Sequence, residues 1–119
     1  MKLKRVYVAG PYSADNIIDV LAHIKDGNDT AAWLILQGFA VFSPFLDFQY
    51  ALTTYGKDIT KAQYQANSMA FVECCDCMIV LPGWGNSIGA NAEIERAMDL
   101  GIPIYFNVHE LVEKECSPT

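Results

Sequence analysis

The sequence predicts an α/β protein in which helices cover both faces of a parallel β-sheet. Short segments rich in apolar and β-branched residues alternate with longer segments whose apolar side chains recur at helical spacing. Residues 77–82 are continuously apolar, which is typical of a strand buried on both faces. The length of 119 residues suits one hydrophobic core, so residues 1–119 are expected to form a single domain.

The first half of the chain is expected to form two strands separated by a helix. A β-branched and aromatic run at 5–11 ends in Gly-Pro and predicts the first strand. The helix is expected over 15–37, with Gly38 as a typical residue just beyond its end. Gly27 is expected to weaken or kink this helix, because glycine is a poor helix former. The second strand is expected at 39–44.

The second half continues the same alternation after an aromatic-rich segment. In order, we expect a short helix with a loop at 45–60, a helix at 61–75, a strand at 77–82, a helix at 88–100 ended by Gly101, a strand at 102–108 and a last helix at 109–115.

Composition excludes several classes of function. The net charge is −6, and the eight Lys and Arg residues are scattered, so binding to a nucleic acid polymer is not expected. No apolar stretch reaches the roughly 18 residues that a membrane span needs, so no membrane partner is expected. The apolar run after the basic N-terminus is too short for a signal peptide, which predicts a cytoplasmic location.

The cysteines do not form a metal site. They include a single C-x-x-C pair, whereas a structural zinc site usually takes two such pairs. The two histidines, His23 and His109, stand apart from this pair. We therefore expect no bound metal, and we expect reduced thiols buried where a helix meets a strand. The four cysteines are Cys74, Cys75, Cys77 and Cys116.

The stretch PGWGNSIGANAEIE (82–95) is the most informative part of the sequence. Its two leading glycines allow tight turns, and Ser87 can cap the helix that follows. The free N–H groups at the start of a helix attract anions such as phosphate. Glu93 lies in about the second helical turn, where its carboxylate is expected to stay ionised. An ionised, positioned carboxylate can attack an electrophilic carbon.

The same residues also fit a purely structural interpretation. Polar residues commonly cap helices, and a glutamate early in a helix matches the helix dipole. Arg96 follows Glu93 by three residues and is a possible ion-pair partner for it. Glu95 lies about 200° around the helix from Glu93, so these two carboxylates do not form one acid–base pair.

Several motifs together resemble the nucleoside 2-deoxyribosyltransferase superfamily. They are YVAGPY (7–12), CDCMIVLPGW (75–84), S-x-G-x-x-x-E (87–93) and A-x-x-x-G-I-P-I (97–104). The similarity extends over residues 5–107 and is greatest to a small branch that is often carried by phages.

The resemblance implies a fold, a reaction and an assembly. The superfamily has a flavodoxin-like fold, a three-layer sandwich, here with a parallel sheet of four to five strands. Its members cleave N-glycosidic bonds through a covalent glycosyl-glutamate, without metal or cofactor, by hydrolysis or by transfer to a second base. Glu93 is the implied nucleophile, and Tyr7 is implied to hold it in place. Relatives of this kind are dimers or larger, so a homodimer or higher homo-oligomer is expected.

The position six residues before Glu93 bears on the substrate. Members that act on nucleosides tend to carry Asp there, whereas the branch that hydrolyses nucleoside 5′-monophosphates carries Ser followed by Gly. A serine hydroxyl and helix N–H groups suit a phosphate dianion, which an Asp would repel. The chain has Ser87 and Gly89, so a nucleotide is favoured over a nucleoside. The expected substrate-binding residues are Gly10, Pro11, Ser13, Asn16, Trp84, Ser87 and Gly89.

One departure from the superfamily leaves an alternative open. Ser68 stands where an Asp usually protonates the leaving base, and a hydroxyl is a poor general acid. Asp47 or Asp58 are candidates to supply the carboxylate instead. The alternative function is a non-catalytic nucleotide-binding module of the same fold, which serves as a sensor or a sponge for a nucleotide.

Overall fold

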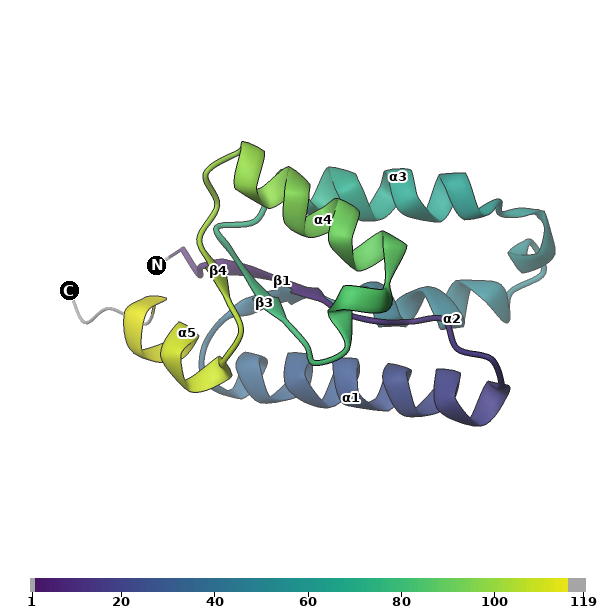
Figure 1. Cartoon of the computed structure of the whole chain (residues 1–119), viewed down its shortest axis with the longest axis horizontal. Helices are drawn as coiled ribbons and strands as arrows, with labels where there is room; N and C mark the ends of the chain where they lie inside the picture. Colours follow the sequence, from purple (N-terminus) through teal and green to yellow (C-terminus); the bar gives the residue numbers. More distant parts are fainter. Residues whose placement is uncertain (1, 116–119) are drawn as a thin grey trace.

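The computed structural model describes residues 2–115. Within these residues, four parallel strands form the central sheet. The strands are β1 (Arg5–Ala9), β2 (Ala40–Phe42), β3 (Cys77–Val80) and β4 (Ile104–Tyr105), and all three pairings between them are parallel. Their order in the sheet is β2-β1-β3-β4, which is the flavodoxin-like order. The predicted fold class is thus confirmed, with four strands (Figure 1).

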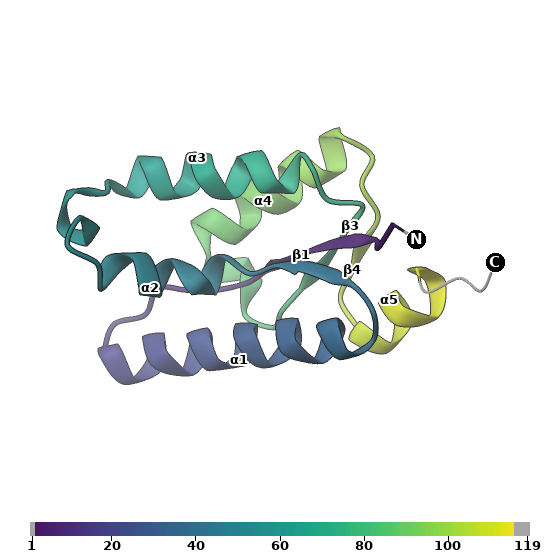
Figure 2. The same ribbon diagram turned by 180° about the vertical axis from the view of Figure 1, so that it is seen from behind.

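Two helices cover each face of the sheet. Figures 1 and 2 show α1 (Ile17–Leu36) and α5 (Val108–Glu115) on one face, with α3 (Lys61–Val72) and α4 (Ile88–Asp99) on the other. Four short segments complete the connections: η1 (Pro44–Leu46), α2 (Asp47–Ala51), η2 (Gly56–Asp58) and η3 (Trp84–Asn86).

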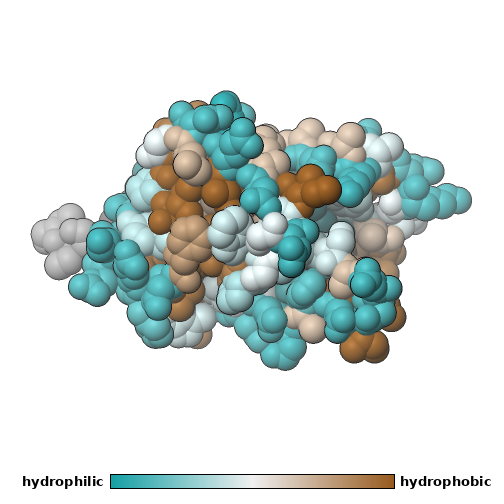
Figure 3. All heavy atoms as spheres, in the orientation of Figure 1, coloured by the Kyte–Doolittle hydropathy of each residue, from teal (hydrophilic) through white to brown (hydrophobic). Residues whose placement is uncertain are grey.

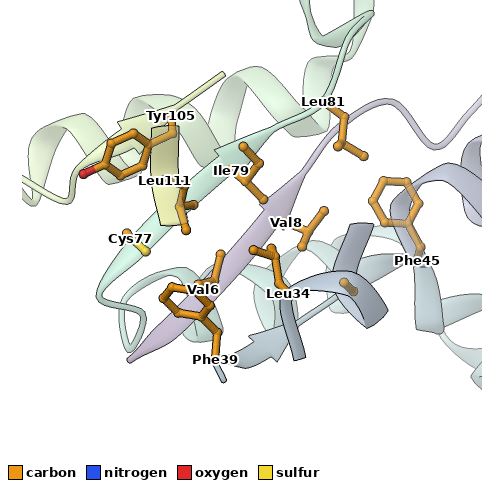
Figure 4. Close-up of a cluster of buried hydrophobic side chains, with 11 residues drawn as sticks. Val6, Val8, Leu34, Phe39, Phe45, Cys77, Ile79, Leu81, Tyr105 and Leu111 are labelled. Atoms are coloured by element: carbon orange, nitrogen blue, oxygen red, sulfur yellow. The ribbon is translucent and has the colours of Figure 1, made fainter. Parts of the chain in front are cut away.

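Alternate residues of the central strands build two cores. Val6 and Val8 of β1 lie in the core beneath α1 and α5, which also contains Leu34 (Figure 4). Tyr7 and Ala9 lie in the core beneath α3 and α4. Successive side chains of a strand point to opposite faces, so a strand covered on both sides must be apolar throughout. This requirement explains the unbroken apolar run of β3.

The last strand is much shorter than the predicted segment 102–108. Only Ile104 and Tyr105 pair with β3. Asn107 ends the strand because its side-chain oxygen accepts the backbone N–H groups of His109 and Glu110, which begins α5. A capping side chain therefore takes the chain out of the sheet two residues after the pairing stops.

Gly27 does not kink α1, contrary to expectation. The helix runs unbroken through this buried position. A Cβ atom placed on Gly27 would lie 2.2 Å from Cδ2 of Phe45. The glycine is therefore required by packing, because the aromatic ring of the segment after β2 occupies the space of its missing side chain. Glycines follow the ends of α1 and α4 as expected, and both Gly38 and Gly101 have positive φ.

The three cysteines within residues 2–115 are free thiols of differing exposure. Cys77 is buried in β3, Cys75 is partly buried and Cys74 is exposed, so the expectation of burial holds only in part. Burial raises the pKa of Cys77 to about 12 and that of Cys75 to about 11, which keeps both thiols protonated. Cys116 lies outside the described residues. Within residues 2–115, no group of three or more metal-ligating side chains occurs.

Apolar side chains gather at the β4 edge of the sheet. Figure 3 shows a brown surface over β4, between α4 and α5. Phe106 is 58% exposed there, and Ile102 and Ile104 are only partly buried. No helix in the described part of the chain has both the length and the apolar character needed to cross a membrane.

Candidate active site

A buried tyrosine and a glutamate meet on the α3/α4 face of the sheet. The Tyr7 side chain is fully buried, and its hydroxyl donates a hydrogen bond of 2.5 Å to Oε2 of Glu93. Tyr7 comes from the middle of β1, whereas Glu93 comes from the second turn of α4. The fold thus joins two residues that lie 86 positions apart in the sequence.

Burial changes the protonation of this pair. It raises the pKa of Glu93 to about 7; the nearby charge of Asp47 acts in the same direction, and the hydrogen bond from Tyr7 opposes the shift. Burial thus works against the ionised form that the sequence predicts for Glu93, because it moves the pKa of this carboxyl toward neutrality. The pKa of Tyr7 is raised far above its usual range, mainly by burial and next by the charge of Glu93. Tyr7 therefore remains protonated and acts as a hydrogen-bond donor.

A second carboxyl group belongs to the same cluster. Asp47 begins α2, shortly after β2 ends beside β1. Burial raises the pKa of Asp47 to about 6, and its charge raises the pKa of Glu93, Tyr7 and Tyr12. Asp58, the other candidate, is exposed in η2 and is not among the charges that act on these groups.

Two hydroxyl groups of α3 complete the cluster. Ser68 is buried, and its hydroxyl acts on Tyr7. This interaction lowers the pKa of Tyr7, but burial and the charge of Glu93 raise that pKa by more. Tyr64 lies one helical turn earlier on the same face, and its charge is felt by Tyr12. The Tyr64 hydroxyl is buried and has no hydrogen-bond partner within residues 2–115. Sequence analysis missed Tyr64; its spacing of four residues from Ser68 was the available signal.

Two stacks of aromatic rings involve Tyr7 and its neighbour in the following loop, Tyr12. The Phe42 ring lies between the rings of Tyr7 and Phe71, with centroid distances of 5.4 and 4.1 Å. The Tyr12 ring stacks on Phe45 at 6.2 Å. The first stack fixes the ring of Tyr7, and the second joins the loop after β1 to the segment after β2.

The glycine-rich loop is tied to the start of α4. Ser87 Oγ accepts the backbone N–H of Ala90 at 3.1 Å, so Ser87 is the cap of the helix. The Asn91 side chain donates to the carbonyl of Ser87 at 2.8 Å and to those of Trp84 and Gly85. A surface hollow of about 390 Å³ lies against this loop, and Glu95, not Glu93, contributes to its wall. Asn91 was not singled out from the sequence, although it lies four residues after the cap.

The ion pair expected between Glu93 and Arg96 does not form. The Arg96 guanidinium instead donates to Glu73 at 3.1 Å, at the end of α3. Glu93 points toward the sheet, whereas the arginine bridges the two helices that cover this face. Glu93 therefore has no cationic partner within the described residues, so no ion pair offsets the effect of burial on its pKa.

The remaining predicted site residues take several positions. Gly10 packs so closely against Leu81 that a Cβ atom would lie 2.9 Å from Leu81 Cβ. Asn16 caps α1 by accepting the N–H of Asp19 at 2.9 Å, so its side chain serves the helix. Ser13 is exposed in the same loop.

The other three predicted residues lie in the loop after β1, in η3 and in the first turn of α4. Pro11 borders a different hollow, of about 350 Å³, on the α1 side of the loop. Trp84 is partly buried, with its ring 5.7 Å from that of Phe106 at the β4 edge, and Gly89 has open space where a Cβ would be.

The comparisons with known proteins agree with this architecture. No curated protein matches the chain. A solved structure of a 2-deoxyribosyltransferase from the psychrotolerant bacterium Bacillus psychrosaccharolyticus matches with a TM-score of 0.59 and 19% sequence identity, over 84% of this chain and 69% of that one. At this identity the likeness concerns the fold. The family model described as "Domain of unknown function (DUF1937)" matches residues 4–108, and the chain therefore belongs to the DUF1937 family.

Proposed function

We propose that the protein cleaves the N-glycosidic bond of a nucleoside 5′-monophosphate or nucleoside, with Glu93 as the nucleophile. The observation that carries this proposal is the 2.5 Å hydrogen bond from Tyr7 to Glu93 inside the α3/α4 face. A buried carboxylate held by a protonated phenol is oriented for attack, and its raised pKa indicates a more basic oxygen once it ionises. The fold shared with a 2-deoxyribosyltransferase supports the same chemistry.

The reaction takes place in two steps at C1′ of the sugar. Tyr7 holds Oε2, which leaves Oε1 free to form the bond to C1′ as the base departs. Water, or a second base, then attacks C1′ from the other face and releases the Glu93 carboxylate. The first step replaces the C1′–N bond with a C1′–O bond to Glu93. The second step replaces that bond with a bond from C1′ to water or to the second base, and neither step requires a metal or cofactor.

The start of α4 is the proposed site for a 5′-phosphate. The Ser87 hydroxyl accepts an N–H from the helix, so its own proton remains available to a phosphate oxygen. The N–H groups of Ile88 and Gly89 lie in the first turn and are not used by the Ser87 cap, and the missing side chain of Gly89 leaves room beside them.

Replacing Ser87 with alanine is expected to raise KM for monophosphates about 10-fold while leaving KM for nucleosides unchanged, because a donor to phosphate contributes about 1.5 kcal/mol. Loss of the cap also lowers the free energy of unfolding by about 1 kcal/mol. The matched control is Thr60→Ala, which removes the cap of α3 and leaves α4 intact. Equal changes of KM for both substrate classes would contradict a phosphate site.

The proposed activity is tested with a panel of ribo- and deoxyribonucleosides and their 5′-monophosphates, followed by chromatography of the free base. Base release from monophosphates is expected. Release from nucleosides alone would agree with Glu93 as the nucleophile but would contradict a phosphate site at Ser87. Ser68 in place of an acid favours the second candidate, a nucleotide-binding module. That candidate predicts a nucleotide-dependent rise in Tm without release of base.

We also propose that the protein forms a homodimer or larger homo-oligomer. The apolar surface over β4, with Phe106 largely exposed, supports self-association. Light scattering is expected to give a mass of at least twice the 13.2 kDa of the chain. A mass of one chain at micromolar concentration would contradict this proposal.

A further inference from the structure

We propose that Asp47 is the general acid that protonates the leaving base, in the role for which Ser68 is unsuited. This inference rests on the proposed function, because it assigns a further catalytic residue to the same reaction. It names a carboxyl group on a different element, at the start of α2 instead of within α3.

The fold places Asp47 beside the reacting carboxylate. Phe42, the last residue of β2, pairs in register with Tyr7 of β1, and the chain turns through η1 directly into α2. Phe45 anchors this turn, since its buried ring packs against α1 and stacks on Tyr12. Asp47 follows this anchored ring by two residues, and its charge acts on both Tyr7 and Glu93.

Both carboxyl groups have raised pKa values. Burial raises the pKa of Asp47 to about 6 and that of Glu93 to about 7, and the charge of Asp47 adds to the shift of Glu93. The other groups that face them, Tyr7 and Tyr12, stay protonated in this range, and no Lys, Arg or His within residues 2–115 is among the groups that shift either carboxyl. The reaction uses the form of the pair in which Glu93 is ionised and Asp47 is protonated, and the hydrogen bond from Tyr7 favours the negative charge on Glu93 in that form.

The proton balance of the reaction then closes within this pair. A lone pair of Glu93 forms the bond to C1′, and the electrons of the C1′–N bond pass to the base, which takes the proton of Asp47. The Asp47 carboxylate next removes a proton from water while the water oxygen attacks C1′. The bond to Glu93 breaks with its electrons, and both carboxyl groups return to their starting states.

An unpaired hydroxyl supports the presence of a polar ligand here. Within residues 2–115, the buried oxygen of Tyr64 has no hydrogen-bond partner, and Tyr64 also acts on the pKa of Tyr12. An unsatisfied buried hydroxyl destabilises the protein, and a polar group of a bound base that reached it would remove this penalty. Hydroxyl and carboxyl groups together suit a nucleobase, which carries both donors and acceptors on its edge.

The test compares substrates whose bases need protonation with substrates whose bases do not. An N7-methylated purine nucleotide carries a positive charge on its base, which leaves as a neutral molecule without a proton. Asp47→Asn is expected to slow the first turnover of base release about 10²–10⁴-fold for ordinary purine substrates. With the N7-methylated substrate, the same variant is expected to remain within a few-fold of wild type, which also shows that it is folded. Asp58→Asn, which alters an exposed carboxylate in η2, is the matched control and should behave as wild type.

The pH dependence gives a second readout. Wild type is expected to be most active between about pH 6 and 7, because the rate rises as Glu93 ionises and falls as Asp47 loses its proton. The Asp47→Asn variant should lose the fall on the alkaline side and keep the rise. A merely structural role for Asp47 would not remove one limb of the profile.

The possible failures are distinguishable. Suppose that wild type releases base but that Asp47→Asn slows base release from both kinds of substrate equally, or from neither. Asp47 is then not the acid, whereas the proposed function stands. If wild type releases base from no substrate, including the N7-methylated one, the proposed function and this inference both fail.

Discussion

Replacing Glu93 with glutamine is expected to lower the rate of base release by about 10⁴-fold or more, because an amide cannot act as the nucleophile. Glutamine has nearly the same size and can still accept the hydrogen bond of Tyr7 through its amide oxygen. The fold and the binding of substrate should therefore survive. The measurement is base release under single-turnover conditions, together with the Kd of a monophosphate.

The matched control for this variant is Glu95→Gln on the same helix. Glu95 is exposed and faces the outer hollow, so its loss should change the rate less than about threefold. An equal loss of activity in both variants would indicate a general effect of charge on α4. Retention of activity in Glu93→Gln would remove the glutamate from the mechanism.

Gly27→Ala is expected to lower the free energy of unfolding by about 3 kcal/mol, at the upper end of the usual cost of overpacking. The added methyl group would lie 2.2–2.5 Å from three atoms of the Phe45 ring. The ring cannot yield easily, because it is buried and stacked on Tyr12. This loss is expected although alanine favours a helix by up to about 1 kcal/mol over glycine.

Chemical denaturation of the variant gives the measurement, with Gly85→Ala as the control. A Cβ at Gly85 meets nothing within 4 Å, so its stability should change by less than about 0.5 kcal/mol. Because Phe45 also positions the turn that leads to Asp47, Gly27→Ala should slow base release as well. Unchanged or increased stability would show that the ring moves aside, in contradiction to the tight packing.

The fold class could be predicted from the sequence because it depends on repeated local patterns. The apolar run of β3 is unbroken because this strand is buried on both faces. The helical spacing of apolar residues before Gly38 arises because α1 is buried on one face only. The limits of β4 could not be predicted in the same way. Residues 102–108 look like a strand throughout, but the capping side chain of Asn107 starts a helix there.

The candidate site could be predicted only in part. The meeting of Tyr7 and Glu93 was implied by motifs that resemble a known superfamily, since nothing in their spacing brings them together. The protonation of Glu93 depends on burial and on Asp47, neither of which is visible before the chain folds. Asp47 itself lies in an aromatic-rich segment without clear periodicity. Arg96 pairs with Glu73 because α3 and α4 pack side by side, a contact between helices that helical spacing does not reveal.

The central claim is that Glu93 forms a covalent bond to the sugar. We would incubate the protein with the best substrate and with its 2′-fluoro analogue, whose fluorine slows breakdown of such an intermediate, and quench in acid. The proposal predicts a mass gain of one glycosyl group on the chain, located at Glu93 by peptide fragmentation and absent from Glu93→Gln. Release of base without any mass gain, or with the sugar attached to a different residue, would contradict it.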